Sequence, residues 1–235
     1  MPERPKLSRS GYRRIITIFL SIAFNAVLFF VAAGRLDLPR GWAYYIVQAL
    51  AMTFIFILMY FRFPETAEVV NARGEMKMPK LWDKLFALSY ALVTMVLMPV
   101  IAGLDVGRYG WLGFDLWWMG LGYSLFFLSL VFSEWALIEN KFFETGVRVQ
   151  KERGQKVVST GPYAIVRHPG YIAFIIMYAS FPLIVGSAYA LYASLLTAIL
   201  FVLRTALEDA TLQKELDGYQ EYTKKTKYRL IPFVW

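Results

Sequence analysis

The chain has 235 residues, of which 58% are hydrophobic and 17% aromatic, and it carries a formal net charge of +8. This composition is too apolar for an ordinary soluble domain and indicates a membrane protein. With no cysteine and a single histidine, His168, the sequence excludes disulfides, thiolate metal sites, a cysteine nucleophile and a histidine-rich metal site.

Four apolar blocks are long enough, or nearly so, for a membrane-spanning helix, which takes roughly 20 residues. They are Ile15–Ala33, Trp42–Phe61, Leu85–Leu104 and Leu116–Phe132. The fourth extends to Ile138 if its helix tolerates Glu134. A longer run, Tyr171–Leu203, is interrupted at Gly186-Ser187, so we expect a tight hairpin of two short helices there. The sequence therefore predicts an all-α integral membrane protein with about six spans.

The basic residues gather on one side of these spans. The two tails and the loops after the second and fourth spans hold 22 of the 25 lysines and arginines, whereas Arg35, Arg40 and Arg108 fall on the other side. Cytoplasmic segments of membrane proteins carry this excess, so both termini are expected in the cytoplasm. Topology accounts for the positive charge, and the pattern requires no nucleic-acid partner.

The two parts of the chain differ in character. Residues 1–138 read as a scaffold of four transmembrane helices. In residues 139–235, a connector of about thirty residues, Glu139–Pro169, is long for a loop that only links helices, and long ordered loops tend to carry function. A polar helix continues past Leu203 with no breaker until Gly218. The hairpin should bring these two polar stretches together at the cytoplasmic face.

The connector ends in Arg167-His168-Pro169, directly before the hairpin. Proline disfavours helix at the preceding residue, so the helix should begin at Pro169 or Gly170. A guanidinium beside free N–H groups at a helix start can bind an anion. Alternatively, Arg167 reaches the lipid phosphates and His168 caps the helix.

Two more polar clusters follow the hairpin. Glu208 and Asp209 lie just past the last span, and Arg204 shares a helical face with Glu208. The acids either form a local ion pair or meet a cationic or hydroxyl-bearing ligand at the membrane surface. Tyr219 and Tyr222 also share a face, where they either contact a cationic ligand or belong to the interfacial aromatic belt.

Five motifs occur in order along this part of the chain: Thr160-Gly161-Pro162-Tyr163, Arg167-His168-Pro169-Gly170-Tyr171, the acidic pair, Tyr219-x-x-Tyr222 and Arg229-Leu230-Ile231-Pro232. Together they resemble the isoprenylcysteine carboxyl methyltransferase family. The related phospholipid N-methyltransferases are similar over the same region, about Glu139–Trp235. The resemblance implies a multi-span helical fold that holds S-adenosylmethionine on the cytoplasmic side, without a metal.

By the same resemblance, the cofactor pocket would be lined by Val158, Gly161, Tyr163, His168, Pro169, Tyr171 and Glu208. Arg167, Arg204 and Glu208 are the candidate catalytic residues. Arg167 is the first candidate to hold a carboxylate acceptor, and Arg204, oriented by Glu208, is the second. The family usually has two glutamates where this chain has Glu208-Asp209, which puts a ligand contact by Asp209 in doubt.

The resemblance implies methyl transfer to a lipophilic acceptor that enters from the bilayer, with a carboxylate as first choice. An alternative is N-methylation of a phospholipid or other lipid amine, for which Glu208 or His168 would be the base. A second alternative is a membrane protein without catalysis, or a small transporter. A transporter should carry charges near the centre of its spans, and here those centres are nearly free of them.

Overall fold

The computed structural model describes residues 6–63, 66–75, 77–110 and 113–235, in which helices are joined by loops and one isolated bridge, Gly113 to Ser187. The α-helices are α1 (Arg9–Ala33), α2 (Pro39–Arg62), α3 (Thr66–Gly74), α4 (Leu81–Ala91), α5 (Met98–Gly103), α6 (Leu116–Glu139), α7 (Pro169–Val185), α8 (Ala190–Glu215) and α9 (Tyr219–Lys225). Two π-helical segments, η1 (Leu92–Leu97) and η2 (Leu104–Tyr109), continue α4 and α5, and the connector holds two 3-10 turns, η3 (Lys151–Arg153) and η4 (Gly161–Ala164).

Five helical stretches in the described residues are long and apolar enough to cross a membrane: α1, α2, the continuous Leu81–Tyr109, α6 and α8. The chain is thus a multi-pass integral membrane protein. As predicted, the fourth block continues past Glu134, and the last apolar run is divided at Gly186. The prediction that both hairpin helices are short is right for α7, with 17 residues, and wrong for α8, whose 26 residues include the polar continuation.

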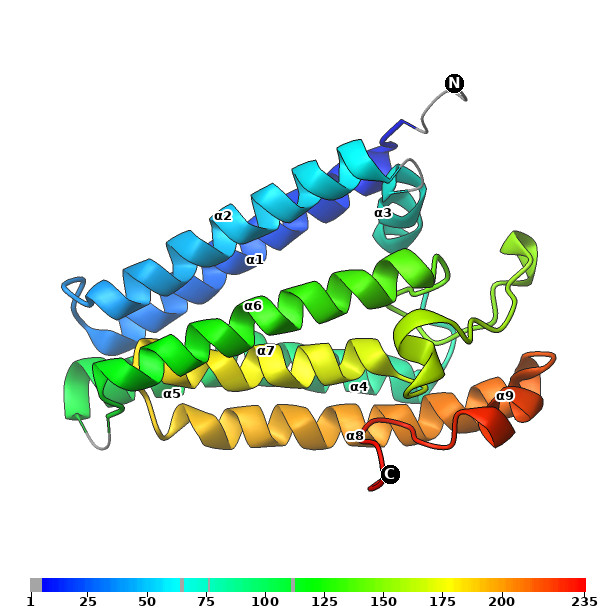
Figure 1. The fold of residues 1–235 in the computed structure, drawn as a ribbon. Helices are drawn as coiled ribbons and strands as arrows, with labels where there is room; N and C mark the ends of the chain where they lie inside the picture. The colour runs from blue at the N-terminus through cyan, green and yellow to red at the C-terminus, as the bar shows by residue number, and fades with distance from the viewer. Residues whose placement is uncertain (1–5, 64–65, 76, 111–112) are drawn as a thin grey trace.

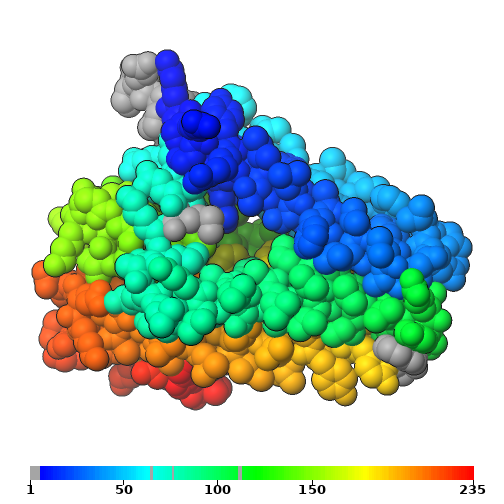
Figure 2. Space-filling view, turned by 180° about the vertical axis from the view of Figure 1, so that it is seen from behind, coloured from blue at the N-terminus to red at the C-terminus, as the bar shows by residue number. Residues whose placement is uncertain are grey.

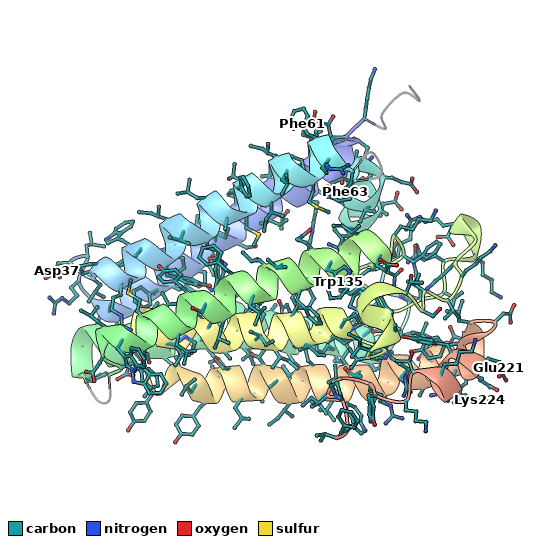
Figure 3. The ribbon with its side chains drawn as sticks, in the orientation of Figure 1. Asp37, Phe61, Phe63, Trp135, Glu221 and Lys224 are labelled. Atoms are coloured by element: carbon teal, nitrogen blue, oxygen red, sulfur yellow. The ribbon has the colours of Figure 1, made fainter. Side chains whose placement is uncertain are left out.

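The sides of the helix bundle expose mainly apolar side chains. Large apolar side chains such as Leu50, Phe54 and Leu195 are well exposed on the long helices. Figure 3 shows charged Asp37 at one end and Glu221 and Lys224 at the other, with mainly carbon side chains between them. This distribution suits a bilayer, because apolar side chains on the sides of the bundle would contact lipid hydrocarbon instead of water.

The helices form two groups (Figure 1). The α1–α2 hairpin lies close to the other helices at the end that carries the α7–α8 turn, and it diverges from α6 toward the end that carries the connector. There α3 packs across the start of α1. The prediction of a plain polar loop between the second and third spans is therefore wrong, because Thr66–Gly74 is helical.

The principal core lies near the α7–α8 turn. Phe29 of α1 contacts Tyr45 of α2 and Phe181 of α7, with ring centroids 5.9 and 6.4 Å apart. Tyr44 meets the same Phe181 ring edge-on at 4.8 Å. Large aromatic pairs of this kind dominate the energetics of a core. Because the core is concentrated here, the other end of the bundle can open between α1–α2 and the remaining helices.

The turn between α7 and α8 requires glycine. Gly186 has φ of +96°, and its N–H donates to Pro182 O at 2.9 Å. The guanidinium of Arg40 crosses to this turn and donates to the carbonyl oxygens of Leu183, Ile184 and Phe114 at 2.6, 2.7 and 2.5 Å. Arg40 thereby satisfies carbonyls that the end of α7 leaves without helical partners.

The third span changes its hydrogen-bond pattern ahead of Pro99. Proline has no N–H to donate within a helix, and the preceding segment η1 is π-helical, with Met98 N–H bonded to Val93 O. The carbonyl oxygen of Thr94 in this segment accepts a 2.9 Å hydrogen bond from Asn25 of α1. The irregular segment thus links the third span to α1.

Candidate functional site

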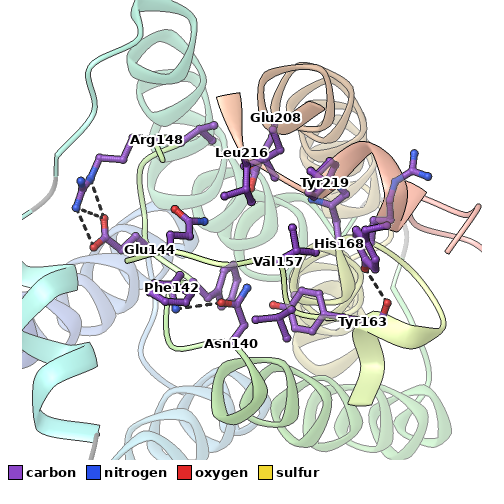
Figure 4. A pocket seen from close by; sticks show the side chains of 18 of the residues that line it. Asn140, Phe142, Glu144, Arg148, Val157, Tyr163, His168, Glu208, Leu216 and Tyr219 are labelled. Carbon is purple, nitrogen blue, oxygen red and sulfur yellow. Dashed lines mark hydrogen bonds and ion pairs between the residues drawn. The ribbon is translucent and has the colours of Figure 1, made fainter. Parts of the chain in front are cut away.

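A pocket lies at the connector end of the bundle, between the end of α6, the connector, the start of α7, the polar half of α8 and α9. Its empty volume, open mouth included, is about 740 Å³. Figure 4 shows Glu208, Leu216 and Tyr219 across the pocket from Asn140, Phe142 and Tyr163.

A buried carboxylate fixes the connector above this pocket. Asp83, at the start of α4, has no exposed surface, and its Oδ2 accepts a 2.7 Å hydrogen bond from the backbone N–H of Val147. Arg204 of α8 lies 3.0 Å from the other oxygen of Asp83 and donates to Thr145 O at 2.5 Å. The loop is therefore held by side chains from two helices, and its wall of the pocket has a defined position.

Glu208 is the acid that faces the pocket. It accepts a hydrogen bond from the hydroxyl of Tyr171, and Arg204 Nε lies 3.9 Å from its Oε2. Its side chain is one-fifth exposed, whereas that of Asp209 has no exposed surface. Glu208 thus presents an oriented carboxylate to a ligand.

Asp209 holds the surrounding segments together and does not line the pocket. Its oxygens accept from Arg167 Nε at 2.8 Å and Nη2 at 3.0 Å, from Arg229 Nε at 3.0 Å and from the Tyr219 hydroxyl at 3.0 Å. Such hydrogen-bonded groups compensate the cost of burying a carboxylate. One residue of α8 thereby connects the start of α7, α9 and the C-terminal segment.

Arg167 is fully engaged by the protein itself. Besides Asp209, its guanidinium binds the carbonyl oxygens of Thr226 and Lys227 at 3.0 and 2.9 Å. The backbone N–H groups of Arg167 and His168 donate to Tyr228 O and Arg229 O. The free anion site expected here from the sequence is not formed, because the C-terminal segment uses its donors.

His168 precedes α7 at the buried edge of the pocket. Its ring stacks on that of Tyr171, with centroids 5.7 Å apart and planes within 7°. Its Nε2 lies 3.4 Å from Asp209 Oδ1 and 3.5 Å from the Tyr219 hydroxyl. His168 therefore packs in the wall of the pocket and supports the ring of Tyr171.

Three tyrosines complete the aromatic side of the pocket. Tyr222 donates to Tyr163 O at 2.7 Å, and Tyr219 donates to Asp209. Burial raises the pKa of Tyr163, Tyr219 and Tyr222 above the ordinary phenol value. The hydroxyls therefore stay neutral at physiological pH and the rings stay available to a cationic ligand.

The structure brings most of the predicted pocket residues together. Val158, Tyr163, His168, Tyr171 and Glu208 all line the pocket. Gly161 and Pro169 do not: Gly161, with φ of +55°, turns the chain against Glu139, and Pro169 starts α7. Whether any of these seven binds a cofactor stays a prediction, as do the catalytic roles of Arg167, Arg204 and Glu208.

Sequence reasoning missed the early connector. Asn140, Phe142, Phe143 and Glu144 line the pocket, although they belong to none of the five motifs. The one signal that could have found them is their position, immediately after a span and at the start of an unusually long loop. The contact of Phe143 with Arg73, and that of Val147 with Asp83, join residues far apart in the sequence and could not be predicted from local pattern.

Comparisons with known proteins find one matching family model, a curated relative and a solved structure. Residues 117–217 match the model of the phospholipid methyltransferase family. A Delta(14)-sterol reductase of Mus musculus is 34% identical over 85 residues, or 35% of this chain, and the chain covers only 20% of that relative's length. The solved eukaryotic intramembrane Ras methyltransferase, an isoprenylcysteine carboxyl methyltransferase, matches with TM-score 0.48 and 17% identity over 97% of this chain and 99% of that one.

The family match runs from α6 to the end of α8, so it includes the connector and most of the pocket wall. It confirms the resemblance to membrane methyltransferases that the motifs indicated. Over residues 117–217, somewhat less than half of the chain, the protein is thus similar to the phospholipid methyltransferase family.

Proposed function

We propose that the protein transfers a methyl group from S-adenosylmethionine to a lipophilic acceptor at the cytoplasmic surface of the membrane. The observation that carries this proposal is the coincidence of the family match with the pocket: residues 117–217 supply nearly all of its walls. The cytoplasmic side is proposed because most basic residues belong to the connector end of the bundle.

The residues of the pocket fit this cofactor chemically. The carboxylate of Glu208, oriented by Tyr171, suits the ammonium of the amino-acid part. Phe142, Tyr163 and Tyr219 offer aromatic faces to the adenine and to the sulfonium cation. Among the described residues, no group of three or more His, Asp or Glu side chains could hold a metal ion.

When bound, S-adenosylmethionine supplies an activated methyl group for in-line displacement. The task of the protein is to align donor and acceptor and to exclude water, and alignment can lower a barrier by about 7–11 kcal/mol in the best cases. The connector, held by Asp83 and Arg204, closes the pocket above Glu208. Neutral Tyr163 and Tyr219 line it without competing as nucleophiles.

A carboxylate is the first choice of acceptor, as the motifs imply. N-methylation of a lipid amine needs a base to accept a proton, and Glu208 is the pocket residue placed for it. Assays with the two acceptor classes separate these reactions.

A second candidate function comes from the sterol reductase relative, which shares 34% identity over 85 residues. A reductase of a sterol-like lipid would need a hydride donor in the pocket instead of a sulfonium. In that case the protein would bind a reduced nicotinamide nucleotide and not S-adenosylhomocysteine.

The test is calorimetric binding of S-adenosylhomocysteine to the detergent-purified protein, with NADPH as the competing ligand. We expect micromolar affinity for S-adenosylhomocysteine, reduced about ten- to hundredfold in Glu208→Gln by the loss of a charge-assisted hydrogen bond. Glu221→Gln is the matched control, since Glu221 is exposed and pairs only with Lys224 among the described residues. Binding of NADPH alone would favour the reductase, and binding of neither ligand by folded protein would refute both enzymes.

A further inference from the structure

A hollow opens beside the candidate pocket, between α1 and the other helices. Figure 2 shows it from behind, bounded by α1 above and the α4–α5 span below, with α6 and α7 visible at its bottom. It follows from the divergence of the α1–α2 hairpin described above. Most side chains of α7 along this stretch, including Phe174, Met177 and Tyr178, are only partly buried although α7 is central to the bundle.

Arg14 lies on the inner face of α1. It precedes Asn25 by three helical turns, and Asn25 contacts Thr94 of the third span, so both residues lie on the face toward that span. Arg14 interacts electrostatically with Tyr90 of α4. Among the described residues it forms no hydrogen bond and no ion pair.

Arg73, at the end of α3, reaches the same region from the other side. Its Nε donates to Phe143 O at 2.9 Å, and its guanidinium lies 5.0 Å from the centroid of the Phe143 ring. Burial, and after it the positive charge of Arg14, lowers the pKa of Arg73 to about 10, with Glu134 acting in the opposite direction. Within the described residues, Arg73 has no carboxylate within ion-pair distance.

Among the described residues, no carboxylate lies within ion-pair distance of Arg14 or Arg73. Two acids act on Arg73 from a longer distance, Glu134 of α6 and Glu144 of the connector. Glu144 already pairs with Arg148 and Arg153, so Glu134 is left to offset one of the two charges. Elsewhere at this end, buried arginines are paired directly, Arg167 with Asp209 and Arg204 with Asp83. An unneutralised guanidinium in an apolar setting is costly, and an anion brought by a ligand would relieve that cost.

The wall between this hollow and the candidate pocket is one aromatic ring thick. Phe143 lines the pocket, and the same ring lies under Arg73. An anion held by Arg73 would therefore stand next to the candidate pocket, on the other side of the Phe143 ring. The rest of the hollow is hydrocarbon and hydrogen-bonded phenols, such as the Tyr90–Tyr178 pair, which suits a lipid chain.

We propose that Arg14 and Arg73 bind the negatively charged headgroup of a lipid acceptor whose chain lies between α1 and α6–α7. This inference rests on the proposed methyl transfer, and it moves the anion-holding role from Arg167, which the protein itself occupies, to two arginines outside the five motifs. They are specificity residues, because they select acceptors that carry an anion at or next to the reacting group.

The experiment measures lipid binding by native mass spectrometry on detergent-purified protein. The probes are oleoyl lysophosphatidate and monooleoylglycerol, which differ by one phosphate, and inorganic phosphate as headgroup alone. We expect wild type to prefer the lysophosphatidate at least about tenfold and to bind inorganic phosphate weakly. Arg14→Gln and Arg73→Gln should each lose this preference, and Arg73→Lys should retain most of it.

Arg9→Gln is the matched control, since Arg9 is exposed on the same helix near the same membrane surface. Calorimetry with S-adenosylhomocysteine on every variant shows whether the protein is folded and its pocket intact, independently of the lipid preference. Equal binding of the two lipids by wild type, an unchanged preference in both glutamine variants, or equal losses in Arg73→Gln and Arg73→Lys would each overturn the proposal. Failure of wild type to bind S-adenosylhomocysteine would instead refute the methyl transfer, while the lipid preference is read independently.

Discussion

The two ends of the bundle use their arginines differently. At the α7–α8 turn, Arg40 donates to three backbone carbonyls and joins helix ends. At the connector end, Arg167 is paired with Asp209, whereas Arg14 and Arg73 lack a carboxylate partner among the described residues. At the α7–α8 turn the arginine completes the hydrogen bonding of the backbone. At the connector end, where we propose that a ligand binds, two arginines have no carboxylate within ion-pair distance among the described residues.

The largest expected effect comes from removing the carboxylate that joins the connector end. Asp209→Ala leaves the guanidinium groups of Arg167 and Arg229 without their partner, and breaking a buried pair in this way costs about 3–5 kcal/mol. The thermal midpoint in detergent should fall markedly, and with it the binding of S-adenosylhomocysteine. Glu221→Ala should leave the midpoint unchanged, and an unchanged midpoint in Asp209→Ala would contradict the joining role.

A smaller change should disturb the pocket through Phe143. A Cβ on Gly170 would lie 2.5 Å from Phe143 Cζ, so Gly170→Ala forces the ring to move. Overpacking of this kind costs about 1–3 kcal/mol. Because Phe143 lines the pocket, affinity for S-adenosylhomocysteine should fall together with the thermal midpoint, and calorimetry checks this. Unchanged affinity would show that the ring moves without altering the site.

The matched change at the other end should affect stability alone. Gly186 has φ of +96°, and a Cβ there would lie 2.8 Å from an Nη of Arg40. The left-handed conformation costs a non-glycine residue about 1–2 kcal/mol. Gly186→Ala should therefore lower the thermal midpoint and keep the affinity for S-adenosylhomocysteine. A loss of affinity as large as that of Gly170→Ala would remove the distinction between the two ends.

The features that sequence predicts here are those set by local pattern. Gly186 divides the last apolar run because glycine takes the left-handed turn that ends α7. Pro169 starts the same helix because its missing N–H needs no helical partner. Glu208 lines the pocket and Asp209 does not, while a ligand contact by either acid stays a prediction.

The features that escaped prediction depend on distant contacts. The short helix α3 carries weak local signals and is held mainly by packing on α1, so its residues looked like a loop. Arg73 gains its position only through Phe143, 70 residues later in the sequence. Arg167 resembled a free anion site because the sequence could not show that Asp209 and the C-terminal carbonyls occupy it.

The pairing of Arg167 and His168 with the C-terminal segment also bears on the order of folding. The carbonyl of Lys227 that binds Arg167 lies 60 residues further along the chain, beyond both helices of the last hairpin. The helices can therefore enter the bilayer while the entrance of α7 is still unbuilt, since contacts across long sequence separations form late. We therefore expect the wall of the pocket at the start of α7 to form only after the C-terminal segment has been synthesised and has packed against Arg167 and His168.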